Sequence, residues 1–129
     1  MGDTDLTGRH ILVVEDDYLI AIDIAGGLEG LGAEIVGMAG SVGEALALIE
    51  TQADRINGAV LDINLGGERV YPVADALASR AISFVFVTGY DRWVFPEAYA
   101  HVPRCDKPVQ FDVLARHLRA TMPTRGKSI

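Results

Sequence analysis

Short apolar runs alternate along the chain with longer segments in which apolar residues recur every three or four positions. The runs cover 10–14, 33–38, 59–62, 82–87 and 101–104. Continuous apolar runs of this length are typical of strands that are buried on both faces of a parallel sheet. Helical spacing follows the first, second, third and fifth runs, over about 17–31, 41–49, 70–78 and 111–118. The pattern therefore predicts five strands alternating with helices.

Capping and turn residues indicate where the helices begin. Asp17 can accept hydrogen bonds at the start of the first helix, and Ser41 followed by Glu44 has the spacing of a capping box. Pro72 falls in the first turn of the third helix, where proline is well tolerated. Glycine and proline interrupt the helical period between 89 and 99, so we expect the fourth helix to be short or irregular.

Five strands alternating with helices indicate an α/β fold with a doubly wound parallel sheet. Right-handed crossovers then favour the flavodoxin-like strand order 2-1-3-4-5, with ligands bound outside the carboxyl ends of the strands at the switch point. We expect a single domain over 1–129, with its core at about 9–121 and a flexible tail at 122–129.

Charge and composition argue against several classes of protein. The formal net charge is −7 and the sequence has no basic stripe, which argues against nucleic-acid binding. No apolar run approaches the roughly 18 residues of a membrane-spanning helix, and residues 1–9 lack the apolar core of a secretory signal. The only cysteine, Cys105, cannot form an internal disulfide and fits a protein of the reducing cytoplasm.

Polar residues follow the apolar runs at their carboxyl ends. Glu15 and Asp16 follow the first run, Asp62 and Thr88 end the third and fourth, and Lys107 lies after the fifth. Adjacent parallel strands would bring these side chains into one crevice. Clustered carboxylates need a cation to offset their repulsion, and oxygen ligands favour Mg²⁺. A lysine and a hydroxyl can contact phosphoryl oxygens, so the sequence predicts a site for Mg²⁺ and a phosphoryl group.

With these residues in this order, the chain resembles the receiver domains of two-component response regulators, over residues 11–118. The resemblance implies that Asp62 accepts a phosphoryl group from the phosphohistidine of a sensor histidine kinase. It implies that Thr88 and Lys107 contact the acylphosphate, and that the chain is a stand-alone signalling phosphoprotein rather than an enzyme. Such a receiver assists its own phosphorylation and dephosphorylation.

The same resemblance implies how Mg²⁺ would be held. Asp16, Asp62 and the backbone carbonyl of Asn64 match the protein ligands of receiver domains, and Glu15 matches an acidic residue that acts through water. Asp17, by contrast, is assigned to the start of the first helix.

Further residues resemble an alphaproteobacterial subgroup of receivers. Its signature is Phe-Ala-Thr-Gly, then a small or aromatic residue, then Tyr; this chain has Val87 in place of the alanine. Members resemble partners of HWE and related histidine kinases. The resemblance therefore implies such a kinase as phosphodonor, and a downstream protein or a histidine phosphotransferase as the receiver of the signal.

One position departs from most receivers, which have Tyr or Phe three residues before the lysine. Here that position is Arg104. Without a ring there, we expect the signal to pass through the loop 89–100 to a partner surface around Tyr90, Trp93 and Phe95. Arg104 would respond to the phosphorylated state by pairing with Asp91 or Glu97.

Two other functions fit parts of the pattern. A Mg²⁺-dependent phosphatase could use Asp62 as nucleophile, but such enzymes carry a second aspartate two residues later, where this chain has Asn64. A binding module that works without phosphorylation would have no need of the full set of acidic, hydroxyl and lysine side chains.

Overall fold

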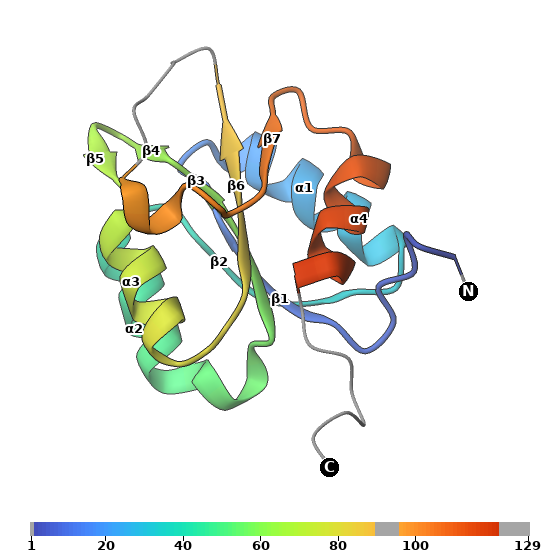
Figure 1. Ribbon diagram of the computed structural model, residues 1–129, viewed down its shortest axis with the longest axis horizontal. Helices are drawn as coiled ribbons and strands as arrows, with labels where there is room; N and C mark the ends of the chain where they lie inside the picture. The colour runs from blue at the N-terminus through green and yellow to red at the C-terminus, as the bar shows by residue number, and fades with distance from the viewer. Residues whose placement is uncertain (1, 90–95, 122–129) are drawn as a thin grey trace.

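The predicted sheet is present in the computed structural model, which describes residues 2–89 and 96–121. Its five strands are parallel and lie in the order β2-β1-β3-β6-β7 (Figure 1), the flavodoxin-like order predicted from the sequence. They are β1 (His10–Val14), β2 (Glu34–Ala39), β3 (Gly58–Asp62), β6 (Phe84–Thr88) and β7 (Arg104–Asp106). Every residue of β3 and β6 is buried, which explains their continuous apolar sequences.

Helices cover both faces of the sheet (Figure 1). On one side lie α1 (Tyr18–Gly30) and α4 (Phe111–Thr121), and on the other lie α2 (Val42–Gln52) and α3 (Tyr71–Ser79). Alternate strand residues divide the core accordingly: Val13 and Val85 pack on the α1 and α4 side, whereas Leu61 and Phe86 pack on the α2 and α3 side. Within the described residues, no helix is both long and apolar enough to span a membrane.

The helix starts follow the predicted chemistry. Asp17 caps α1 by accepting hydrogen bonds from the backbone N–H groups of Leu19 and Ile20. Ser41 caps α2 in the same way, through the N–H of Glu44. The carboxylate of Glu44 reaches back to the N–H of Gly40 rather than to that of Ser41, so the capping box is shifted by one residue.

Two details of the sequence prediction change, and the expected irregularity of the fourth helix is found. The last strand begins at Arg104, not at His101, because Pro103 has no N–H to donate to a ladder. A two-stranded hairpin that was not predicted, β4 (Asn64–Leu65) and β5 (Glu68–Arg69), follows β3. In the described part of 89–99, the irregular fourth helix is a single 3₁₀ turn at Glu97–Tyr99; the predicted tail 122–129 lies outside the described residues.

One glycine of α1 fixes how closely α1 and α4 pack. A Cβ atom on Gly27 would lie closer than 3.0 Å to the ring of Phe111, the first residue of α4. The neighbouring Gly26 has open space at the same point. Of these two glycines, packing therefore requires Gly27 and does not require Gly26.

The two glycines give a matched pair of variants. Gly27→Ala should lower the free energy of unfolding by about 1–2 kcal/mol, because the ring of Phe111 must move. Gly26→Ala should leave it unchanged or raise it by up to about 1 kcal/mol, since alanine favours a helix. Urea denaturation of both variants tests this, and equal stabilities would contradict the close packing of Phe111 on Gly27.

Candidate phosphoacceptor site

The polar residues predicted to converge do meet at the carboxyl edge of the sheet. Glu15 follows β1, Asp62 ends β3, and Lys107 follows β7. A pocket of about 320 Å³ lies at this edge, and these side chains line it together with Asp16, Asp17, Ile20, Asn64 and Gly89. Thr88, at the end of β6, is buried beside this edge.

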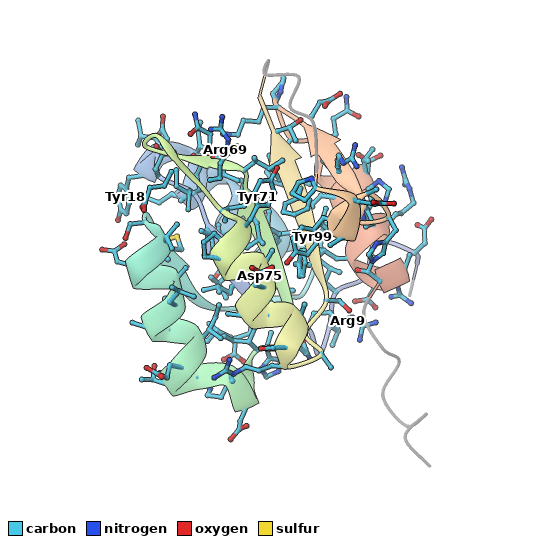
Figure 2. The ribbon with its side chains drawn as sticks, turned by 60° about the vertical axis from the view of Figure 1, so that its left-hand side comes forward. Arg9, Tyr18, Arg69, Tyr71, Asp75 and Tyr99 are labelled. Carbon is cyan, nitrogen blue, oxygen red and sulfur yellow. The ribbon has the colours of Figure 1, made fainter. Side chains whose placement is uncertain are left out.

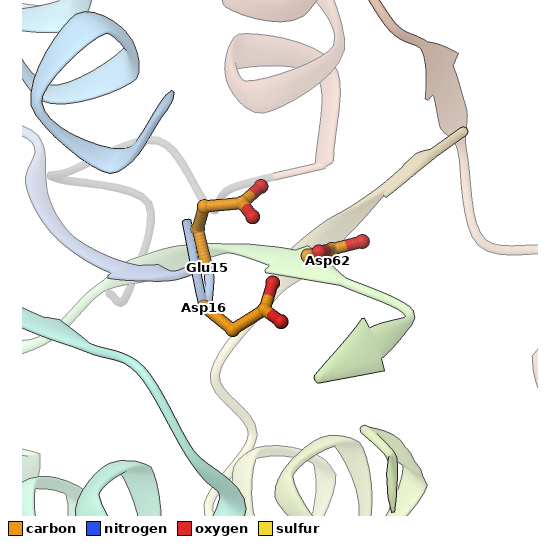
Figure 3. A group of neighbouring side chains, drawn as sticks. All are labelled: Glu15, Asp16 and Asp62. Atoms are coloured by element: carbon orange, nitrogen blue, oxygen red, sulfur yellow. The ribbon is translucent and has the colours of Figure 1, made fainter. Parts of the chain in front are cut away.

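Three carboxylates form the acidic part of the site (Figure 3). Glu15, Asp16 and Asp62 each place an oxygen within 4.8 Å of the others. Glu15 and Asp62 are buried, whereas Asp16 is exposed at the rim. The arrangement follows from strand geometry, because the ends of β1 and β3 are adjacent in the ladder.

Lys107 neutralises part of this charge. Its Nζ lies 2.9 Å from Oε1 of Glu15 and 3.3 Å from Oδ2 of Asp62. The other oxygen of Glu15 accepts a hydrogen bond from the N–H of Asp17 at 3.1 Å. Oδ1 of Asp62 accepts one from the N–H of Asn64 at 3.4 Å. One ammonium group thus serves two buried carboxylates.

Burial dominates the protonation of these groups. Desolvation raises the pKa of Glu15 to about 7, against the opposing attraction of Lys107, and it also raises the pKa of Asp62. Burial by itself would lower the pKa of Lys107, but its contacts with Glu15 and Asp62 outweigh that effect and the pKa is raised. The lysine stays charged, and the pocket favours a further positive charge beside the carboxylates.

The donor set fits a hard divalent cation. Every acidic ligand candidate offers oxygen, and one exposed carboxylate leaves the site open to water on its outer side. Mg²⁺ is typically held by one or two carboxylates, with water at its other positions, and this cluster offers three carboxylates to choose from. Asn64, the first residue of β4, lines the same pocket.

The hairpin that follows Asp62 contributes a contact that the sequence did not predict. Gly66 and Gly67 form its turn with φ values of +57° and +96°, a conformation that favours glycine. The N–H of Gly66 donates to Oδ2 of Asp16 at 2.9 Å. The hairpin therefore holds the exposed carboxylate of the cluster. The Gly-Gly pair between Asn64-Leu65 and Glu68-Arg69 was the available signal.

Thr88 has an acceptor that the sequence reasoning missed. Its Oγ1 donates a hydrogen bond to Oδ1 of Asp106 at 3.1 Å. The two residues are direct partners in the parallel ladder between β6 and β7. Counting back one residue from Lys107 could have found Asp106, had the register of this short strand been known.

An aromatic cluster covers β6 on the α3 side. The rings of Tyr71 and Tyr99 stack with centroids 6.0 Å apart, and both meet Phe86 edge to face. The hydroxyl of Tyr99 donates to Asp75 of α3, and Figure 2 shows these side chains together. Desolvation raises the pKa of Tyr99 to about 12. Rings are thus supplied here by β6, by α3 and by the 3₁₀ turn rather than by β7.

Arg104 is exposed at the start of β7, where most receivers carry a ring. Its Nη2 donates to the carbonyl oxygen of Ala100 at 3.2 Å. Of the partners suggested for it, Asp91 lies outside the described residues, as do the predicted surface residues Tyr90, Trp93 and Phe95.

No protein-family model matches the sequence. Among solved structures, the fold is similar to SdrG from Sphingomonas melonis, at 41% identity over 94% of this chain and 98% of that one, with a TM-score of 0.77. It is also similar to the response regulator PhyR from Brucella abortus, at 26% identity and a TM-score of 0.75, over 93% of this chain and 50% of that one.

Among curated proteins, the phyllosphere-induced regulator PhyR of Methylorubrum extorquens is 34% identical over 83 residues, which is 63% of this chain and 31% of that protein. The match thus covers 31% and 50% of these two PhyR proteins, but nearly all of SdrG. Sequence identity, fold and strand order agree with the resemblance seen in the motifs: the chain belongs to the response regulator receiver domains.

Proposed function

We propose that this chain is a Mg²⁺-dependent phosphoacceptor that takes a phosphoryl group onto Asp62 from the phosphohistidine of a sensor histidine kinase. The observation that carries the proposal is the setting of Asp62. Its carboxylate ends a buried strand, contacts the Nζ of Lys107 at 3.3 Å, and shares a cluster with Glu15 and Asp16. A carboxylate so placed is a nucleophile with cationic support already beside it.

In the transfer, an oxygen of Asp62 would form a bond to phosphorus while the phosphorus–nitrogen bond to the donor imidazole breaks. Asp16, Asp62 and the carbonyl of Asn64 would hold Mg²⁺, with Glu15 acting through water. The cation would supply charge neutralisation for the phosphoryl oxygens. Lys107 would keep its charge and pair with a phosphoryl oxygen, and Thr88 would donate its hydroxyl proton to another.

The role that we infer is signalling rather than catalysis on an outside substrate. The phosphorylated chain would act by contact with a downstream protein, or would pass the group to a histidine phosphotransferase. A kinase of the HWE or a related type is the donor that we propose from the sequence motif. The cytoplasm is the compartment that fits a buried free thiol at Cys105.

The enzyme alternative has weaker support. A phosphatase that uses Asp62 would need an acid two residues later to protonate the leaving group, and Asn64 there has no such proton. Its side-chain oxygen accepts hydrogen bonds from Gly67 and Arg69 within the hairpin. A binding module that works without phosphorylation is the remaining alternative.

One experiment separates these functions. The protein is incubated with acetyl phosphate and Mg²⁺, and its intact mass is followed by mass spectrometry. We expect a gain of one phosphoryl group that needs Mg²⁺ and that decays when acetyl phosphate is removed. Continuous hydrolysis of unrelated phosphoesters would favour a phosphatase, and an unchanged mass would favour the binding module.

A further inference from the structure

The ladder between β6 and β7 places a carboxylate against the hydroxyl of Thr88. Thr88 and Asp106 are paired in register, and directly paired residues of neighbouring strands project to the same side of a sheet. The N–H of Lys107 donates to the carbonyl oxygen of Thr88 at 2.8 Å, which fixes the two backbones relative to each other. Oγ1 of Thr88 and Oδ1 of Asp106 are then 3.1 Å apart.

A threonine hydroxyl carries a single proton, so it can donate to one acceptor at a time. In this structure the acceptor is a carboxylate, and hydrogen bonds to ionised acceptors are stronger than those to neutral ones. The side chain of Thr88 is itself buried, so water competes little for its proton. A phosphoryl oxygen on Asp62 would have to replace the carboxylate of Asp106 as the acceptor of this hydrogen bond.

We propose that Asp106 is a positioning residue that holds the hydroxyl of Thr88 away from the phosphoryl site. It thereby weakens the state in which this hydroxyl bonds to a phosphoryl oxygen on Asp62, which we call the engaged state. The inference rests on the proposed function of Asp62 and adds a competitor to it. Asp106 is not among the residues that line the acidic pocket, and its carboxylate is bonded to Thr88, so it would act through Thr88. Its side chain is exposed, so it can be replaced without opening the core.

The competition makes a quantitative prediction for a phosphoryl mimic. Beryllofluoride bound at Asp62 in the presence of Mg²⁺ would offer fluorine atoms where the phosphoryl oxygens lie. Asp106→Ala should tighten its binding by about three- to tenfold, because the hydroxyl of Thr88 is then free to turn toward it. Removal of a nearby negative charge also favours an anion, and this second effect does not need Thr88.

A double-mutant cycle separates the two effects. Beryllofluoride affinity is measured by titration for the wild type, Asp106→Ala, Thr88→Val and the double variant. We expect Asp106→Ala to tighten beryllofluoride binding more when Thr88 is present than in the Thr88→Val background. At least half of the gain in affinity should be lost in that background. Equal effects in the two backgrounds would overturn the proposal in favour of simple charge repulsion.

A second readout follows the side chain itself. The methyl group of Thr88 should report one rotamer in the free wild type and averaged rotamers in free Asp106→Ala, by NMR scalar couplings. An unchanged single rotamer in Asp106→Ala would also overturn the proposal. If the wild type takes up acetyl phosphate but the cycle shows no coupling, this inference alone fails. If the wild type takes up neither acetyl phosphate nor beryllofluoride, the proposed function fails with it.

Discussion

Asp62→Asn should abolish phosphoryl incorporation from acetyl phosphate, with a fall of more than about a hundredfold in the rate of labelling. An amide nitrogen or oxygen is a far weaker nucleophile than a carboxylate. The substitution keeps the shape of the side chain, and Lys107 retains Glu15 as a partner at 2.9 Å. The fold should therefore persist, and circular dichroism of the variant should match that of the wild type.

Asp17→Asn is the matched control for this experiment. Asp17 lines the same pocket, but its side chain is used to cap α1, a role that asparagine fills equally well. We expect this variant to be labelled at the wild-type rate. Undiminished labelling of Asp62→Asn would refute Asp62 as the phosphoacceptor. So would peptide mapping of the wild type that finds the phosphoryl group on another residue.

Asp16→Ala should weaken Mg²⁺ binding by roughly tenfold or more, because it removes the exposed carboxylate of the cluster. Phosphorylation at limiting Mg²⁺ should slow in proportion. Without the cation, the variant should be as stable as the wild type to within about 1 kcal/mol, since the lost hydrogen bond from Gly66 is replaced by water at an exposed turn.

The measurement is a titration with Mg²⁺ followed by the melting temperature, which rises when a ligand binds only the folded state. We expect a clear rise for the wild type and for Asp17→Asn, and a much smaller one for Asp16→Ala at the same concentration. Equal rises in all three proteins would place the cation elsewhere.

The sheet could be predicted from the sequence because its central strands carry an unambiguous signal. Residues 59–62 and 84–88 are apolar up to their last positions and are buried throughout. Strand order then followed from crossover handedness, and the convergence of Glu15, Asp62 and Lys107 followed from strand order. Proximity in space is thus found as predicted, whereas the roles of these side chains stay predictions.

The contacts that were missed depend on register and on turns, which periodicity does not encode. β7 is three residues long, and the sequence placed it three residues too early, so the pairing of Thr88 with Asp106 was out of reach. The stack of Tyr71 on Tyr99 joins α3 to a 3₁₀ turn whose position no helical period marks. Such side-chain contacts between distant segments are set by tertiary packing.

The close packing of Phe111 on Gly27 has a consequence for how the Thr88 hydroxyl changes from Asp106 to a phosphoryl oxygen. Asp106 is held by its ladder to β6, and four residues beyond Lys107 the ring of Phe111 is held against α1. Lys107 therefore lies in a short segment between two fixed points. The hydroxyl of Thr88, by contrast, needs only a rotation about one bond to change its hydrogen-bond acceptor. Side-chain rotations are among the faster motions of a protein, faster than movements of whole segments. Asp106 would then set the fraction of molecules in which Thr88 bonds to the phosphoryl group, rather than the rate at which its side chain rotates.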